Sequence, residues 1–136
     1  MTVMPRFRLA AVGALAVASV VLLAGCSAQQ NAFTDLQGER GASDELPQLA
    51  DHAYDDLDVS SSRFVGEHEG TSLWLAQGLE DSSVCLVADP GDDDWVVGCG
   101  GGGTKVVGRA GSFEIVPDGV PAPEGATQVS ENVYAW

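Results

Sequence analysis

The sequence predicts a small α+β domain: an antiparallel β-meander of five to seven strands, one amphipathic helix packed on it, and one disulfide. Apolar residues recur every three or four positions between Leu46 and Leu57, as on one face of a helix. From Arg63 onward they alternate instead in short runs separated by turn residues, as in strands. Cys85 and Cys99 fall in two such runs, where a disulfide would join neighbouring strands.

The N-terminal segment, residues 1–25, has the composition of a secretory signal peptide. Arg6 and Arg8 precede an uncharged run from Leu9 to Ala24. This run is shorter than the roughly 20 apolar residues of a membrane-spanning helix, and a short basic segment before it is typical of a signal peptide. We therefore expect export of the chain. The cysteine that follows this run could belong to a lipid-attachment motif, as argued next. The alternative is an ordinary signal peptide or anchor that happens to contain a cysteine.

The end of this segment, Leu23-Ala24-Gly25-Cys26, resembles the lipobox of bacterial lipoproteins. In that family the cysteine thiol is diacylglycerylated, the chain is cut before the cysteine, and the lipidated cysteine becomes the N-terminus. The resemblance implies cleavage after Gly25, with Leu23, Ala24 and Gly25 as the cleavage motif, and a lipid anchor on Cys26. Each buried methylene adds about 0.8 kcal/mol, so two or three acyl chains would hold the protein firmly at the membrane.

Cleavage would also make the net charge of the chain more negative. Residues 26–136 keep all 20 acidic side chains but only four basic ones, a side-chain charge of −16. Clustered carboxylates repel phosphate groups, which excludes electrostatic binding to nucleic acid or anionic lipid.

The residues that follow Cys26 are polar and show no apolar periodicity. We expect residues 26–42 to be the lipidated cysteine and a flexible tether, and residues 43–136 to form the extracytoplasmic domain. Docking of Phe33 and Leu36 on the domain is the alternative.

The domain opens with the predicted helix, which we expect to end near Leu57. Pro47 fits the first turn if Ser43 or Asp44 caps the helix, because the missing amide proton costs little there. Asp56 and Asp58 oppose the dipole at a helix C-terminus. The apolar stripe consists of Leu46, Leu49, Ala50, Ala53, Tyr54 and Leu57.

Strands are predicted for the remainder of the chain as successive hairpins. Glu69-Gly70 forms the first turn and Arg109-Ala110-Gly111 the last. The expected strands are residues 63–67, 71–76, 83–89, 95–99, 105–108 and 112–116, with a possible edge strand at 132–136. The expected core consists of Leu46, Leu49, Ala53, Leu57, Phe64, Leu73, Leu75, Leu86, Val96, Val107, Phe113 and Ile115.

The middle hairpin fixes the cysteine pairing. Pairing Asp89 with Trp95 across the Pro90–Asp94 turn sets Cys85 opposite Cys99. If Cys26 carries lipid, these two remain as an even pair in an oxidising compartment, so we predict a disulfide between them. A redox or metal site is the alternative, but the C-x-x-C spacing and nearby histidines are missing.

The order of these segments resembles small exported lipoproteins of actinobacteria, most of which have no assigned function. The resemblance covers nearly the whole chain: the lipobox, a polar tether, a helix, an R-F-V-G-E hairpin ending L-W-L-A, V-C-L-V and W-V-V-G-C strands, and a late V-P-D-G. It implies a location and a fold without implying a substrate.

The sequence predicts no catalytic residue, no metal site and no cofactor. His52 and His68 lie outside any recognisable catalytic motif, so we interpret both as solvated surface residues. The glycine run 100–103 before Thr104-Lys105 differs from a phosphate-binding loop because lysine follows threonine.

Two binding hypotheses remain open. Calcium could bind Asp92-Asp93-Asp94 with Asp89, although the D-x-[DN]-x-[DN]-G spacing is absent and a solvated turn is the simpler interpretation. Trp74, Trp95 and Trp136 could form an exposed aromatic platform for a glycan or peptide, a hypothesis that requires Trp74 and Trp95 to lie exposed and adjacent.

These features predict a lipid-anchored protein at the outer face of the cytoplasmic membrane. We expect a non-catalytic binding or accessory module that contacts an envelope protein or polymer and no nucleic acid. The alternative is an extracellular enzyme, which would need a concave site with convergent polar groups.

Overall fold

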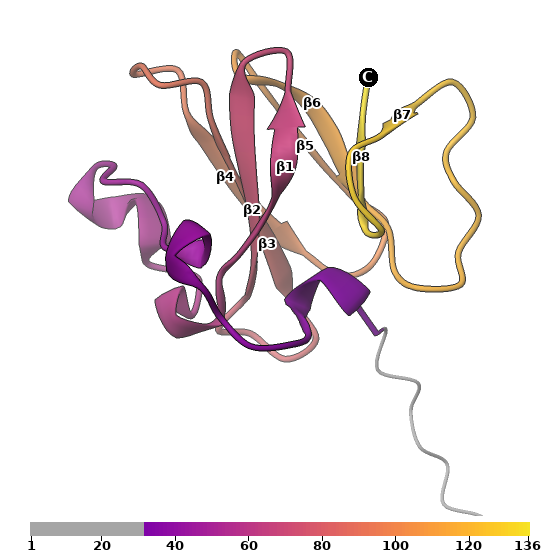
Figure 1. The fold of residues 1–136 in the computed structure, drawn as a ribbon, viewed down its shortest axis with the longest axis horizontal. Helices are drawn as coiled ribbons and strands as arrows, with labels where there is room; N and C mark the ends of the chain where they lie inside the picture. Colours follow the sequence, from indigo (N-terminus) through magenta and orange to yellow (C-terminus); the bar gives the residue numbers. More distant parts are fainter. Residues whose placement is uncertain (1–31) are drawn as a thin grey trace, which may run out of the picture.

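The computed structural model describes residues 32–136, which form two antiparallel four-stranded sheets and four short 3-10 turns (Figure 1). The predicted cleavage motif and lipidation site lie outside these residues. Within residues 32–136 no helix is long and apolar enough to cross a membrane.

The first sheet is a meander in which each strand pairs with the next one along the chain. Its strands are β1 (Arg63–His68), β2 (Thr71–Gln77), β3 (Val84–Asp89) and β4 (Val96–Gly100). Glu69 and Gly70 both have positive φ, 48° and 80°, as a tight hairpin turn requires. The two hairpins predicted for this part of the chain are therefore confirmed.

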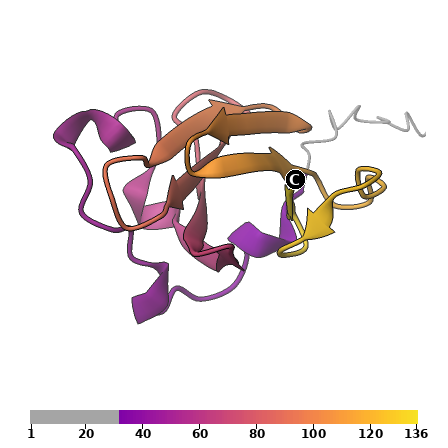
Figure 2. The ribbon, with the colours of Figure 1, turned by 90° about the horizontal axis from the view of Figure 1, so that it is seen from above.

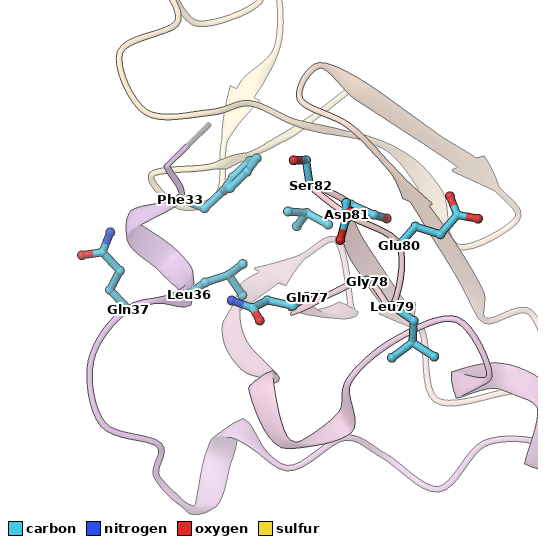
Figure 3. A pocket seen from close by; sticks show the side chains of 11 residues that line it. Phe33, Leu36, Gln37, Gln77, Gly78, Leu79, Glu80, Asp81 and Ser82 are labelled. Carbon is cyan, nitrogen blue, oxygen red and sulfur yellow. The ribbon is translucent and has the colours of Figure 1, made fainter. Parts of the chain in front are cut away.

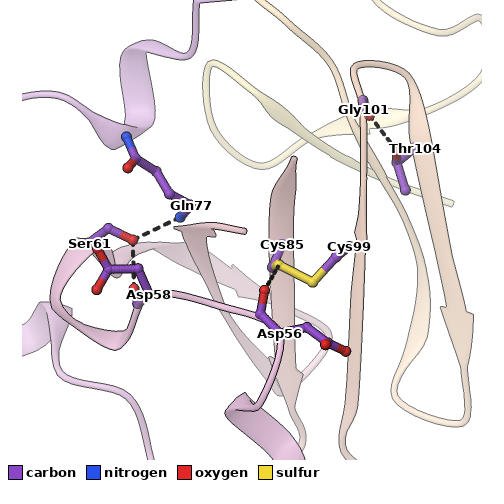
Figure 4. The surroundings of a disulfide bond; sticks show 8 residues. All are labelled: Asp56, Asp58, Ser61, Gln77, Cys85, Cys99, Gly101 and Thr104. Atoms are coloured by element: carbon purple, nitrogen blue, oxygen red, sulfur yellow. Dashed lines mark hydrogen bonds between the residues drawn. A yellow bond between two sulfur atoms is a disulfide. The ribbon is translucent and has the colours of Figure 1, made fainter. Parts of the chain in front are cut away.

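The register between β3 and β4 is the predicted one. Val87 faces Val97, Cys85 faces Cys99, and the two cysteines form a disulfide (Figure 4). The Cys85 side chain lies fully buried in β3, whereas Cys99 is exposed on β4. This bond ties the edge strand β4 to the centre of the sheet.

The second sheet contains β5 (Thr104–Gly108), β6 (Gly111–Ile115), β7 (Thr127–Gln128) and β8 (Val133–Ala135), in the order β5-β6-β8-β7. The C-terminal segment that we expected at an edge lies inside the sheet, because the short strand β7 pairs with its outer side.

The main core lies between the inner faces of the two sheets (Figure 2). Leu73, Leu75 and Leu86 from the first sheet meet Val106, Phe113 and Ile115 from the second. Two predicted core residues are wrong. Val107 is 67% exposed because its neighbour Val106 takes the inward position of β5, and Phe64 is 39% exposed at the irregular start of β1.

The predicted amphipathic helix is also wrong. Its residues form a largely extended segment that contains one short 3-10 turn, η3 (Asp51–Tyr54), between the turns η2 (Ala42–Asp44) and η4 (Val59–Ser61). Five of the six residues in the predicted stripe are nevertheless buried or half-buried, whereas Ala50 is exposed. Leu46, Leu49, Tyr54 and Leu57 cover the outer side of the first sheet, against Trp74, Ala76, Cys85, Val87 and Val97.

Side-chain donors form hydrogen bonds with backbone carbonyls that a helix would use for its own hydrogen bonds. In a helix the Asp44 carbonyl would accept a bond from the amide four residues later, but here it accepts from the Ser62 hydroxyl at 2.6 Å and from Arg40 at 3.2 Å. The Pro47 carbonyl accepts a 2.5 Å bond from the Tyr54 hydroxyl. Tertiary hydrogen bonds thus replace the helical ladder.

Candidate functional site

The segment that enters the domain, Ala32 to Gln37, is part of the folded unit. Phe33 is 7% exposed and packs in the main core, and Leu36 packs against the same cluster. The Ala32 carbonyl accepts a 2.9 Å bond from the Asp118 amide. The docking alternative for Phe33 and Leu36 is therefore the arrangement that the structure shows.

A polar network holds the turn η1 (Thr34–Leu36) in this place. Thr34 donates from its amide and its hydroxyl to the two Asp118 carboxylate oxygens, at 3.0 and 2.9 Å. The fully buried Asn132 side chain accepts from the Asp35 amide at 2.9 Å. It also donates 2.8 Å bonds to Asp118 and to the Val116 carbonyl. The bonds of Thr34 and Asp35 join residues that lie 84 and 97 positions apart in sequence.

The network also sets the ionisation of Asp118. The bond from the Asn132 side chain, followed by the bond from the Thr34 amide, holds the pKa of Asp118 below its ordinary value of 3.8. Each donor favours the charged form of the carboxylate. Asp118 therefore contributes stability above about pH 4 that is lost as the pH falls through its lowered pKa.

Replacement of Asp118 by Asn is expected to reduce stability in a pH-dependent way. The substitution Asp118→Asn keeps the shape of the side chain but removes the charge that strengthens these bonds, at a cost of about 1 kcal/mol near pH 7. Urea denaturation between about pH 7 and pH 2.5 should show the difference from the native protein shrinking below about pH 4. A difference that stays constant over this range would contradict the role of the charge.

A surface pocket of about 430 Å³ lies beside the docked segment (Figure 3). We call it the loop pocket, because Phe33, Leu36 and Gln37 line one side of it and residues 77–84, which include the loop between β2 and β3, line the other. Figure 3 shows Phe33 and Leu36 across the pocket from the loop side chains.

The loop itself has a defined backbone. The Gly78 amide bonds to the Ser83 carbonyl at 2.8 Å, and the Leu79 amide bonds to the Asp56 carbonyl at 2.9 Å. A Cβ atom at Gly78 would collide with the Ser83 side chain, so this position requires glycine. Ser82 adopts φ = 60°, an uncommon conformation for a residue other than glycine.

The loop pocket is lined by both hydrogen-bond acceptors and apolar side chains. Glu80 and Asp81 bring carboxylates, and no salt bridge within residues 32–136 involves either of them. The polar side chains of Gln37, Gln77, Ser82 and Ser83 also make no hydrogen bond to another group of residues 32–136. No lysine, arginine or histidine lines the pocket. The site therefore carries uncompensated negative charge.

Sequence reasoning missed the loop pocket. Its two halves lie about forty residues apart, and only the structure brings them together. The one available signal was that Phe33 and Leu36 are the apolar residues in an otherwise polar stretch.

The tryptophans do not form the aromatic platform that was one of the open hypotheses. Trp74 is 9% exposed, packs edge-on against Phe64 with 5.4 Å between ring centroids, and donates from Nε1 to the Ser43 carbonyl at 3.2 Å. Trp95 is half-buried, with its ring centroid 5.8 Å from that of His52. Both side chains are used in packing rather than displayed together.

The acidic turn does not assemble a calcium site. Asp89 and Asp92 accept 2.8 Å bonds from the amides of Gly91 and Asp94, two residues further along, and the Asp94 carboxylate lies 3.3 Å from Arg109. Among residues 32–136, no group of three His, Cys, Asp or Glu side chains is placed to hold a metal ion.

The other candidates of the sequence lie apart from one another. His68 lies 3.9 Å from Glu69 at the β1–β2 turn, on a different element from His52. The glycine run forms the turn between β4 and β5, where the Thr104 hydroxyl donates to the Gly101 carbonyl (Figure 4).

Comparison of the chain with protein-family models, with curated proteins and with solved structures gave no match.

Proposed function

We propose that the protein is a lipid-anchored, non-catalytic binding or accessory module on the outer face of the cytoplasmic membrane. The observation that carries the proposal is the lipobox-like sequence ending at Cys26. The disulfide supports it, because Cys85 and Cys99 are bonded to each other and leave Cys26 as the remaining thiol of the chain.

The docked segment limits how far an anchored domain could stand from the membrane. The Ala32 carbonyl is hydrogen-bonded to the domain, and Ala32 lies six positions after Cys26. A fully extended chain of that length spans about 20 Å. Under this proposal the tether is residues 26–31, and the loop pocket lies near the membrane surface.

The charge of the domain is consistent with a body that stays in water. Arg40 and Arg63 donate to backbone carbonyls, including those of Ser62 and Gly38, and Arg109 pairs with Asp94 at 84% exposure. Most carboxylates of residues 32–136 therefore remain without a basic partner. Like charge would keep the domain from lying flat on anionic lipids.

A binding role fits the loop pocket better than a hydrolytic one. The pocket offers carboxylates, amides and hydroxyls whose side chains make no hydrogen bond or salt bridge within residues 32–136, while His52 and His68 lie outside it. Its partner would be an envelope protein or polymer that presents groups complementary to those acceptors.

Replacement of Cys26 by Ala is expected to abolish acylation and to strand or release the precursor. Metabolic labelling with a fatty-acid analogue, followed by membrane fractionation, measures both effects. The double variant Cys85→Ala/Cys99→Ala is the matched control and should keep the label. Continued labelling of Cys26→Ala would contradict the proposal.

A further inference from the structure

We propose that Cys99 is the site at which the disulfide exchanges with an external thiol, and that Cys85 is the thiol released in the exchange. The two bonded cysteines have unequal surroundings: Cys85 has no exposed surface, whereas Cys99 is exposed. This chemistry belongs to the folded domain and does not require the lipid anchor.

The position of each cysteine in the first sheet accounts for the difference. Cys85 lies on β3, between β2 and β4, and packs with Leu57 in the cluster on the outer side of the sheet. Val97 is the residue of β4 that packs against the same cluster. Cys99 lies two positions further along β4, at the end of the sheet order. The apolar cover therefore closes over Cys85 and leaves Cys99 in contact with solvent.

The immediate neighbours of the two sulfur atoms differ as well. The Cys85 Sγ lies 3.8 Å from the Asp56 carbonyl oxygen, on the covered side of the bond (Figure 4). Cys99 stands between Gly98 and Gly100, which have no side chains to shield it. An attacking thiolate thus reaches Cys99 in the folded protein, but it reaches Cys85 only after the cover over β3 opens.

Two effects oppose each other in the choice between the sulfurs. Burial disfavours a thiolate, so Cys99 leaves more readily than Cys85, which favours attack on Cys85 by about tenfold. The need to open a packed region disfavours the same attack by about a hundredfold or more. Access therefore decides, and the net preference is attack on Cys99 by about tenfold or more.

The exchange runs in two steps. In the first, a thiolate bonds to the Cys99 sulfur, the bond to Cys85 breaks, and its electron pair stays on the Cys85 sulfur, which takes a proton from water. In the second, another thiolate attacks the reagent's sulfur in the mixed disulfide and releases Cys99 as a thiol. Two reagent thiols are oxidised to a disulfide while the protein disulfide is reduced. A partner protein that carries two neighbouring thiols supplies both steps itself.

The structure also suits the products of the first step. The Cys85 sulfur carries no hydrogen in the disulfide, and once it is released as a thiol it can donate to the Asp56 carbonyl beside it. In the reverse direction, Cys85 displaces the partner from Cys99, because the register of β3 and β4 sets the two residues opposite each other. Cys99 thus meets the partner, and Cys85 closes the bond.

Treatment of the oxidised full-length protein with 2-mercaptoethanol tests the proposal. This monothiol is neutral, so the acidic domain does not repel it. N-ethylmaleimide marks the free thiols, and cleavage at the aspartates of the turn 90–94 separates the two cysteines for mass spectrometry. At early times the mercaptoethanol adduct should be about tenfold more abundant on Cys99 than on Cys85. Equal adducts, or a preference for Cys85, would overturn the proposal.

The same reaction in concentrated urea shows whether the fold is responsible. Both cysteines are exposed in the unfolded chain, so the two adducts should become nearly equal. A preference for Cys99 that persists in urea would contradict the assignment, because local sequence rather than burial would then set the selectivity.

Two leucine variants locate the cover. Leu57 is 4% exposed and packs with Cys85, so Leu57→Ala should raise the share of adduct on Cys85 by about fivefold or more. Leu79 is 66% exposed and lies outside this cluster, so Leu79→Ala should leave the distribution unchanged. An unchanged distribution in Leu57→Ala, or an equal rise in both variants, would contradict burial as the cause. The measurement on the native chain decides the proposal whether or not Leu57→Ala folds stably.

Discussion

Truncation of Phe33 to alanine is expected to lower the free energy of unfolding by about 3–4 kcal/mol. The ring is 7% exposed and packs with core residues of both sheets, although it precedes the first strand by thirty positions. Its loss would leave a cavity at the end of the core and loosen the wall of the loop pocket. Urea denaturation of the full chain measures the change.

Phe64 provides the matched control for this truncation. It is also a phenylalanine, but it is 39% exposed, and its ring packs edge-on against the Trp74 ring. Its replacement by alanine should cost about 1 kcal/mol. If the two variants lose equal stability, the segment before residue 42 is not part of the folded unit.

Loss of the disulfide is expected to lower stability by about 3 kcal/mol. The bond closes a loop between residues separated by 14 positions, which restricts the unfolded chain. The variant Cys85→Ala/Cys99→Ala and the native chain treated with a reductant should show similar urea midpoints. The reductant should not shift the variant further, and a native midpoint insensitive to reduction would contradict the bond.

The strands of the first sheet could be predicted because several local signals agree there. Alternating apolar residues, a turn of Glu69 and Gly70, and the cysteine spacing all specify one register. The second sheet was predicted in part. Val106 and Val107 are chemically equivalent, and only the pairing of Val106 with Phe113 shows which of them faces the core.

The helix could not be excluded from its sequence, because its apolar pattern suits either a helix or a segment packed on a sheet. What decides the outcome is distant in sequence. Ser62 and Arg40 bond to the Asp44 carbonyl, and Asp44 accepts through its side chain from the Phe64 amide at 2.8 Å. These bonds favour the extended course over the helical one.

The loop pocket and the hydrogen-bond network around Asn132 could not be predicted from the sequence either. Asp35 and Asn132 are 97 positions apart, and no periodicity connects them. Polar residues in a stretch without apolar periodicity are typical of a tether, yet Thr34 and Asp35 here hold the chain onto the domain.

The most direct test of the account is the mass of the N-terminal peptide of the protein extracted from membranes. The account predicts a peptide that begins at Cys26 and carries acyl chains, together with a disulfide-linked pair of peptides containing Cys85 and Cys99. A peptide that retains residues 1–25, or a free Cys26 thiol, would contradict the lipid anchor on which the proposed function depends.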